Sequence, residues 1–244
     1  MPLTRRAFAF SLAATTAASF ITPAFAKSVA DPFFGPDEVP LIKILPPCPA
    51  DDSALTMKET ADYKTFIPTV AKDRADKAVA DNTYGINRVL AGMKGYETFD
   101  VEKLPNAKLL FDRLLATGGA IIDQAKKDFG RRRPFLVDPS IVPLIPIDDK
   151  LKKSPAYPSG HTAMAELCAY TLSLIAPEKR ADFYARATEY GFSRYIIGVH
   201  YLTDIEASKM AVPAIAMVLR KNDEFLKAVE SATPEMRAAL GLSN

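Results

Sequence analysis

The 244-residue sequence contains no tryptophan, only two histidines and only two cysteines. It also lacks a run of strictly alternating polar and apolar residues, and it has no Asn-Gly or Asp-Gly pair, so the usual signals of a β-sheet protein are missing. Without C-x-x-C or H-E-x-x-H spacing, the few histidines and cysteines argue against a zinc site. An exported protein could join Cys48 to Cys168 in a disulfide. We expect no bridge, because Cys168 lies on a predicted buried helix face.

Residues 1–26 have the composition of a signal peptide. Arg5 and Arg6 precede a stretch of small and apolar residues, and Ala24-Phe25-Ala26 forms an A-x-A cleavage site. A transmembrane anchor fits less well, because threonines, serines and a proline interrupt the apolar stretch. The arginine pair resembles a twin-arginine export signal, and an ordinary secretory signal stays open. Both routes predict export to the periplasm, with no membrane association after cleavage.

The rest of the chain, residues 27–244, has the length of one domain. Removing the two arginines of the signal leaves 29 basic and 29 acidic residues, and hence a formal net charge of zero. This balance predicts neither a nucleic-acid partner nor binding to an anionic membrane surface. The sequence leaves open whether the protein forms a homo-oligomer.

The pattern along this domain predicts an all-α fold. Residues 27–53 contain six prolines and predict an extended arm, whereas apolar residues recur at helical spacing from Ser53 onward. Thr233, Pro234 and Gly241 predict a short last helix with an N-cap, a first-turn proline and a glycine stop. Residues 132–159 are proline-rich and separate two helices, and a loop of this length inside a compact domain is usually functional.

The first cluster of candidate site residues is K-K-D-F-G-R-R-R-P. Lys127, Arg131 and Arg132 are interpreted as a solvated helix end, where basic residues are favoured. Lys126 and Arg133 lie seven residues apart and would share one face if the helix continued through Gly130. The following proline turns Arg133 away from helical geometry, so its guanidinium could enter a cleft and bind a phosphate.

The second cluster is P-S-G-H at residues 158–161. Gly160 lets the backbone approach a ligand, and the free N–H groups at a helix start favour an anion. Ser159 adds a hydroxyl donor, and His161 follows directly. The alternative is an ordinary helix start, with Ser159 as the N-cap and His161 exposed.

The third cluster is S-R-Y-I-I-G-V-H-Y-L-T-D. His200 and Asp204 are spaced i and i+4, which makes them neighbours if they lie on one helix. A carboxylate that accepts one ring N–H leaves the other nitrogen as a lone pair, as a nucleophilic or basic histidine requires. The alternative is a surface His–Asp pair. Arg194 lies six residues earlier, and Gly198 could turn the backbone between them. Taken together, cations, a helix start and a His–Asp pair fit phosphoryl transfer.

These three motifs resemble a superfamily that contains the bacterial class A non-specific acid phosphatases, the lipid phosphate phosphatases and the vanadium haloperoxidases. Its signature is K-x6-R-P, then P-S-G-H, then S-R-x5-H-x3-D, and every position is matched here between residues 126 and 204. The export signal and the segment K-I-L-P-P favour the acid phosphatases. Ala207 stands where a glycine is common in the superfamily.

The resemblance implies a helical fold and a metal-independent hydrolase of small phosphate monoesters with broad specificity, working without a cofactor. It assigns His200 as the nucleophile, Asp204 as the residue that orients it and His161 as the acid and base. The implied phosphate-binding residues are Lys126, Arg133, Ser159, Gly160 and Arg194. The alternatives are a periplasmic protein that only binds phosphate or vanadate, and a haloperoxidase-like enzyme that uses the same site.

Overall fold

The computed structural model describes residues 30–243, so the predicted signal peptide at 1–26 lies outside the described residues. No strand occurs within 30–243, which confirms the all-α prediction. The α-helices are α1 (Ala54–Phe66), α2 (Lys72–Ala80), α3 (Ile86–Ala91), α4 (Pro105–Phe129), α5 (Pro134–Val137), α6 (Asp149–Lys153), α7 (Gly160–Ile175), α8 (Arg180–Ile196), α9 (Leu202–Leu219) and α10 (Asp223–Ala239). Short 3-10 turns are η1 (Pro36–Glu38), η2 (Leu41–Lys43), η3 (Ile67–Thr69), η4 (Val101–Lys103) and η5 (Pro177–Lys179).

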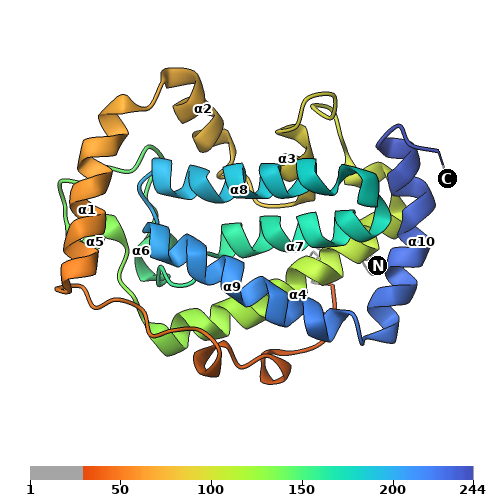
Figure 1. Ribbon diagram of the computed structural model, residues 1–244, viewed down its shortest axis with the longest axis horizontal. Coiled ribbons are helices and arrows are strands. Elements are labelled where there is room, and N and C mark those ends of the chain that lie inside the picture. The colour runs from red at the N-terminus through yellow and green to blue at the C-terminus, as the bar shows by residue number, and fades with distance from the viewer. Residues whose placement is uncertain (1–29, 244) are drawn as a thin grey trace, which may run out of the picture.

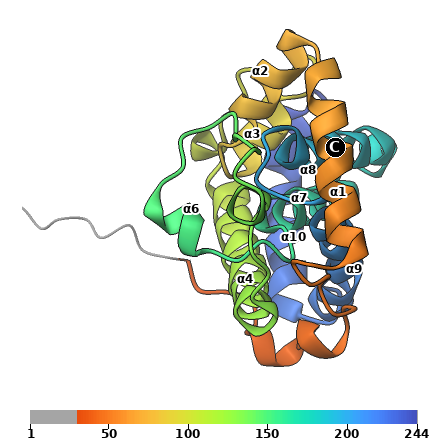
Figure 2. The same cartoon turned by 90° about the vertical axis from the view of Figure 1, so that its left-hand side faces the viewer.

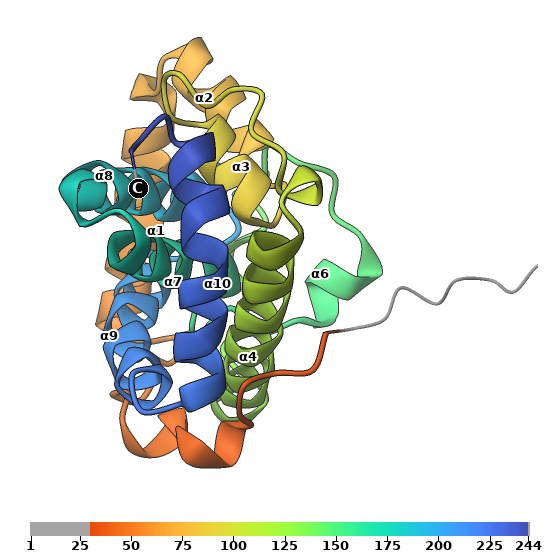
Figure 3. The ribbon, with the colours of Figure 1, turned by 90° about the vertical axis from the view of Figure 1, so that its right-hand side faces the viewer.

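Helix α7 lies at the centre of the fold and contacts α4, α8, α9 and α10 (Figure 1). The short turn η5 reverses the chain after α7, so α8 packs antiparallel along it. Helices α1 and α10 stand at opposite ends of the molecule, and α10 lies beside α4 (Figure 3). Helix α6 projects from the side on the long loop between α5 and α7 (Figure 2). Within 30–243, no helix is both long and apolar enough to span a bilayer.

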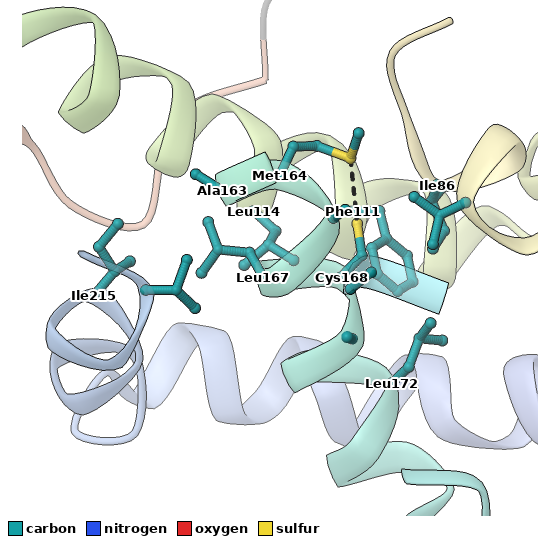
Figure 4. Close-up of a cluster of buried hydrophobic side chains, with 14 of the residues drawn as sticks. Ile86, Phe111, Leu114, Ala163, Met164, Leu167, Cys168, Leu172 and Ile215 are labelled. Carbon is teal, nitrogen blue, oxygen red and sulfur yellow. Dashed lines mark hydrogen bonds between the residues drawn. The ribbon is translucent and has the colours of Figure 1, made fainter. Parts of the chain in front are cut away.

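The central position of α7 follows from its sequence, which is apolar on nearly all sides and carries no lysine or arginine. Its Leu167 and Leu172 belong to one buried cluster with Phe111 and Leu114 of α4 and Ile215 of α9 (Figure 4). The thiol of Cys168 is buried here, with Sγ 3.8 Å from Sδ of Met164. Cys168 and Cys48 are both free thiols, as predicted.

From residue 30 to Ser53, the described part of the proline-rich arm contains no α-helix and only the 3-10 turns η1 and η2. It is anchored by apolar side chains: Leu41 and Leu45 are buried, and Phe33 packs edge-on against Phe225 of α10 at 5.4 Å between ring centroids. The main-chain N–H of Phe33 donates to Oγ1 of Thr117 on α4 at 2.8 Å. The arm therefore ties α4 to α10.

The predicted separate helix at the C-terminus is wrong at its start. Thr233 and Pro234 lie inside α10, and Oγ1 of Thr233 donates to the carbonyl of Val229 at 2.7 Å instead of capping a new helix. Proline inside a helix removes one hydrogen bond. Because Phe225 and Met236 on the same helix are both fully buried, packing against the core outweighs that loss. The helix ends before Gly241, whose φ of 70° is left-handed, as the glycine stop predicted.

Candidate active site

A cavity of about 690 Å³ opens between α4, the loop before α7, the end of α8 and the turn between α2 and α3. Six of the eight predicted site residues line it: Lys126, Arg133, Gly160, His161, Arg194 and His200. The two others, Ser159 and Asp204, are fully buried and lie behind the wall. The three sequence motifs therefore converge on one pocket.

Lys126 and Arg133 meet by a route that differs from the prediction of one shared helix face. Helix α4 ends at Phe129, and Gly130 is left-handed with φ of 65°. Arg133 is in extended conformation, and its Nε donates to the carbonyl of Ser154 at 2.8 Å. Nζ of Lys126 donates to the carbonyl of Pro155 at 2.8 Å. The loop before α7 thus supplies the carbonyl oxygens that hold both cations.

Ser159 is the N-cap of α7, as the alternative interpretation of P-S-G-H predicted. Its Oγ accepts from Oγ1 of Thr162 at 3.0 Å and from the N–H of Thr162 at 3.4 Å. Its own N–H donates to the carbonyl of Asp204 at 3.1 Å, and Oγ of Ser208 donates to its carbonyl at 2.8 Å. These bonds fasten the start of α7 to the first turns of α9. A Cβ on Gly160 would point between Ile122 and Lys126, at 3.7 and 3.9 Å, so glycine keeps this wall open.

His200 and Asp204 do not share a helix face, which corrects the i, i+4 interpretation. Helix α9 begins at Leu202, and Tyr201 is its N-cap. The Asp204 carboxylate reaches back over the cap: Oδ2 accepts from the N–H of Tyr201 at 2.9 Å and lies 3.1 Å from Nδ1 of His200. The contact is therefore set by helix capping, and it fixes the imidazole outside the helix.

The partners of His200 determine its tautomer. A carboxylate without a proton can only accept, so Nδ1 carries the hydrogen. Nε2 lies 3.2 Å from Nη1 of Arg133, and a guanidinium can only donate. The lone pair of His200 is therefore on Nε2, at the pocket wall.

A left-handed turn places Arg194 and His200 on the same pocket. Helix α8 ends at Ile196, and Gly198 has φ of 77°. A Cβ there would also approach Oη of Tyr63 to 2.7 Å, so both conformation and space require glycine. Nη1 of Arg194 donates to Oδ1 of Asn82 at 2.7 Å, whereas its Nε is buried and has no acceptor in the described residues.

Asn82 holds His161 as well, through its main chain. Nε2 of His161 lies 3.1 Å from the carbonyl oxygen of Asn82. A carbonyl only accepts, so Nε2 carries a hydrogen and Nδ1 is the nitrogen that can gain or lose a proton. The ring of His161 also meets the edge of Tyr84 at 5.1 Å between centroids. No motif in the sequence pointed to Asn82, because it lies over forty residues before the first motif.

The interpretation of Arg131 as part of a solvated helix end is wrong. It is 3% exposed, and its Nη1 donates to Oδ1 of Asp204 at 2.6 Å while Nη2 donates to Oε2 of Glu59 at 2.9 Å. Its guanidinium also stacks over the ring of Tyr201 at 4.0 Å. Burial raises the pKa of Asp204 to about 6, and Arg131 opposes that rise. Arg131 thereby favours the ionised carboxylate that orients His200.

The pocket is strongly cationic. Lys126, Arg133 and Arg194 are each at most 6% exposed, and none forms an ion pair within residues 30–243. Burial, together with the charge of Arg133, lowers the pKa of Lys126 to about 7. Burial also lowers the pKa of each of the two arginines to about 10. Burial and the neighbouring cations hold the pKa of both histidines well below the ordinary value. The arrangement therefore favours binding of an anion.

Among the described residues, no group of three or more histidine, cysteine, aspartate or glutamate side chains is placed to ligate a metal ion. Lys126, Arg133 and Arg194 supply positive charge at the pocket.

Comparison with known proteins agrees with this site. Residues 110–222 match the PAP2 superfamily, a range that includes all three motifs. A non-specific acid phosphatase of Salmonella typhi is 31% identical over 184 residues, which cover 73% of each chain. The chain belongs to the PAP2 superfamily. A non-specific acid phosphatase of Providencia stuartii is 29% identical over 197 residues, covering 80% of this chain and 79% of that protein. An acid phosphatase of Zymomonas mobilis is 27% identical over 206 residues, covering 82% and 76%.

The family membership predicted from the three motifs is thereby confirmed. The resemblance implied an acid phosphatase, and each of these relatives is named an acid phosphatase. The individual roles of the site residues remain predictions.

Arg131→Met should destabilise the protein by about 3–5 kcal/mol, because it leaves two buried carboxylates, Glu59 and Asp204, without their cation. Urea unfolding measures the change. Arg132→Met is the matched control. Arg132 is exposed, and its contacts within residues 30–243 are an ion pair with Asp51 at 3.3 Å and a hydrogen bond to the carbonyl of Leu136, so that change should stay within about 0.5 kcal/mol. Equal stability of the two variants would contradict the structural role given to Arg131.

Binding of inorganic phosphate should take up protons at about pH 8. In the empty pocket Lys126 has a pKa of about 7, so it is mostly neutral at that pH, and a phosphate dianion favours its charged form. Affinity for the phosphate dianion should accordingly fall as the pH rises above about 7, toward the higher pKa that Lys126 has beside bound phosphate. Titration calorimetry in buffers of different ionisation enthalpy measures the uptake. Lys126→Met should bind more weakly and take up fewer protons, whereas proton release by the unaltered protein would contradict the assignment.

Proposed function

We propose that this protein is an exported acid phosphatase of broad specificity. It would hydrolyse phosphate monoesters through a phosphohistidine on His200. The observation that carries the proposal is the cationic pocket: within residues 30–243, Lys126, Arg133 and Arg194 have no acidic partner, and they share the pocket with a histidine whose lone pair is on Nε2. Its relatives are named acid phosphatases, which supports the same reaction class.

The proposed reaction has two displacements. His200 Nε2 attacks phosphorus, the ester P–O bond breaks, and His161 gives a proton to the departing alkoxide. A water molecule then attacks the phosphohistidine, His161 takes its proton, and the P–N bond breaks to release inorganic phosphate. In both steps the three cations and the N–H groups at the start of α7 would stabilise charge on the phosphoryl oxygens.

The carboxylate of Asp204 supports the role of His200 as the nucleophile. Asp204 accepts the Nδ1 hydrogen and would offset the positive charge that the ring carries while phosphorylated. Arg131 keeps that carboxylate in place from behind. Substrate binding should also raise the low pKa of His161, because a phosphate dianion reduces the positive field of Arg194. The protonated acid would thus be favoured when substrate is bound.

Metal independence belongs to the same proposal, since Lys126, Arg133 and Arg194 supply the charge that a metal ion would otherwise provide. A protein that only binds phosphate or vanadate would need these donors as well. Such a protein would not need Asp204 to hold the hydrogen of His200 on Nδ1 and leave a lone pair on Nε2. This arrangement therefore favours an enzyme.

Export to the periplasm rests on Arg5, Arg6 and the A-x-A site, which lie outside the described residues. If the twin-arginine route is used, changing both arginines to lysine should leave phosphatase activity in the cytoplasmic fraction. Unchanged periplasmic activity would assign the protein to the general secretory route, and cytoplasmic activity of the unaltered chain would contradict export.

The two histidines should fail in different ways. His200→Ala removes the nucleophile, so no phosphoenzyme forms from any substrate. His161→Ala removes only the proton donor, whose contribution is typically about 10²–10⁴-fold and grows with the basicity of the leaving group. It should therefore retain measurable activity on p-nitrophenyl phosphate and almost none on an alkyl phosphate. Phosphoenzyme is measured with radioactive substrate after a quench without acid. Turnover of both esters is measured in EDTA.

The unaltered enzyme in EDTA is the control for both variants. The roles are wrong if His200→Ala becomes labelled while His161→Ala does not. Loss of turnover in EDTA, with recovery on adding Mg²⁺ or Zn²⁺, would overturn metal independence.

A further inference from the structure

One face of α4 extends the pocket well beyond the phosphate-binding residues. Residues at helical spacing along this face line the cavity: Leu115, Gly118, Gly119, Ile122, Asp123 and Lys126. At 1.5 Å per residue, Gly119 lies about 10 Å and Leu115 about 16 Å along the axis from Lys126. The cavity therefore has a cationic inner end and an outer part with an apolar wall.

The outer part has apolar side chains from other elements as well. Ile145 and Pro146 of the loop before α7 line the cavity, as does Tyr84, which is 46% exposed. Leu151 of α6 lines it as well, and its carbonyl accepts from Nε of Arg133 at 3.1 Å at the cationic end. The edge-on contact of Tyr84 with His161 places this ring next to the proposed proton donor, where the leaving group must depart. The remaining charges there, Asp123, Asp148 and Lys150, are of both signs and favour no strongly charged ligand.

The two adjacent glycines of α4 differ in what surrounds them. A Cβ on Gly118 would lie 2.5 Å from Cδ1 of Leu167, so Gly118 allows α7 to pack closely. A Cβ on Gly119 would meet nothing within 4 Å, although Gly119 also lines the cavity. Helix packing does not require glycine at 119, and glycine within a helix costs about 0.5–1 kcal/mol relative to alanine. Its effect is to leave the cavity wider.

The size of the cavity exceeds what phosphate alone needs. About 690 Å³ lies within the range of about 300–1,000 Å³ of pockets that enclose drug-sized ligands, whereas phosphate is one tetrahedral ion. We propose that Tyr84, Leu115 and the open space at Gly119 form a leaving-group slot, which selects phosphate monoesters of flat aromatic alcohols over those of small alkyl alcohols. This inference rests on the proposed phosphatase activity.

The test compares kcat/KM for 2-naphthyl phosphate with that for ethyl phosphate, because the ratio cancels effects on steps that both esters share equally. Damage to His161 would raise the ratio, since the alkyl ester depends more on the proton donor, whereas loss of the slot lowers it. Gly119→Leu fills the slot with an aliphatic side chain, so the ratio should fall on the order of 10–100-fold relative to the unaltered enzyme. Ala120→Leu is the matched control. It adds the same side chain one position further along α4, where Ala120 is exposed and outside the cavity, and should change the ratio by less than about twofold.

A second pair of variants keeps the test decisive if Gly119→Leu does not fold. Tyr84→Ala should lower the ratio by about two- to tenfold, and Tyr84→Phe should preserve it, because the ring and not the hydroxyl makes the contact. An unchanged ratio in folded Gly119→Leu, or equal loss of both activities, would overturn the slot while phosphatase activity stands. If the unaltered enzyme hydrolyses neither ester, the proposed function fails, and the slot with it.

Discussion

Lys126, Arg133 and Arg194 are buried in one pocket, and no carboxylate in the described residues pairs with any of them. Burying an unpaired charge costs several kcal/mol, so the rest of the fold must hold these side chains in place against the tendency to reach water. The apolar α7 and the layers packed on it provide that stability. Binding an anion offsets part of this cost, so the three cations favour an anionic ligand.

Charge of the opposite sign is kept on the other side of His200. Asp204 and Glu59 share Arg131, and all three side chains are buried away from the pocket. The imidazole therefore lies between a neutralised acidic cluster and an unneutralised cationic one. This separation fixes its tautomer, because one neighbour can only accept a hydrogen and the other can only donate one.

The helical fold and six pocket-lining residues could be predicted from the sequence, since apolar spacing and short motifs are local properties. The routes by which residues meet could not. His200 contacts Asp204 across the N-cap of α9 and not along one helix face. Arg131 is buried although its neighbour Arg132 is exposed. Asn82 had no signal, because its contacts with His161 and Arg194 come from the α2–α3 turn packing against α7 and α8. Such contacts depend on tertiary packing.

Two cations and one histidine of the site are held by main-chain oxygens. Lys126 donates to Pro155, Arg133 to Ser154 and Val199, and His161 to Asn82. A point substitution changes a side chain but leaves its carbonyl oxygen in place. For these bonds the path of the loop before α7 matters more than the identity of its side chains, so the loop should tolerate inserted or deleted residues poorly.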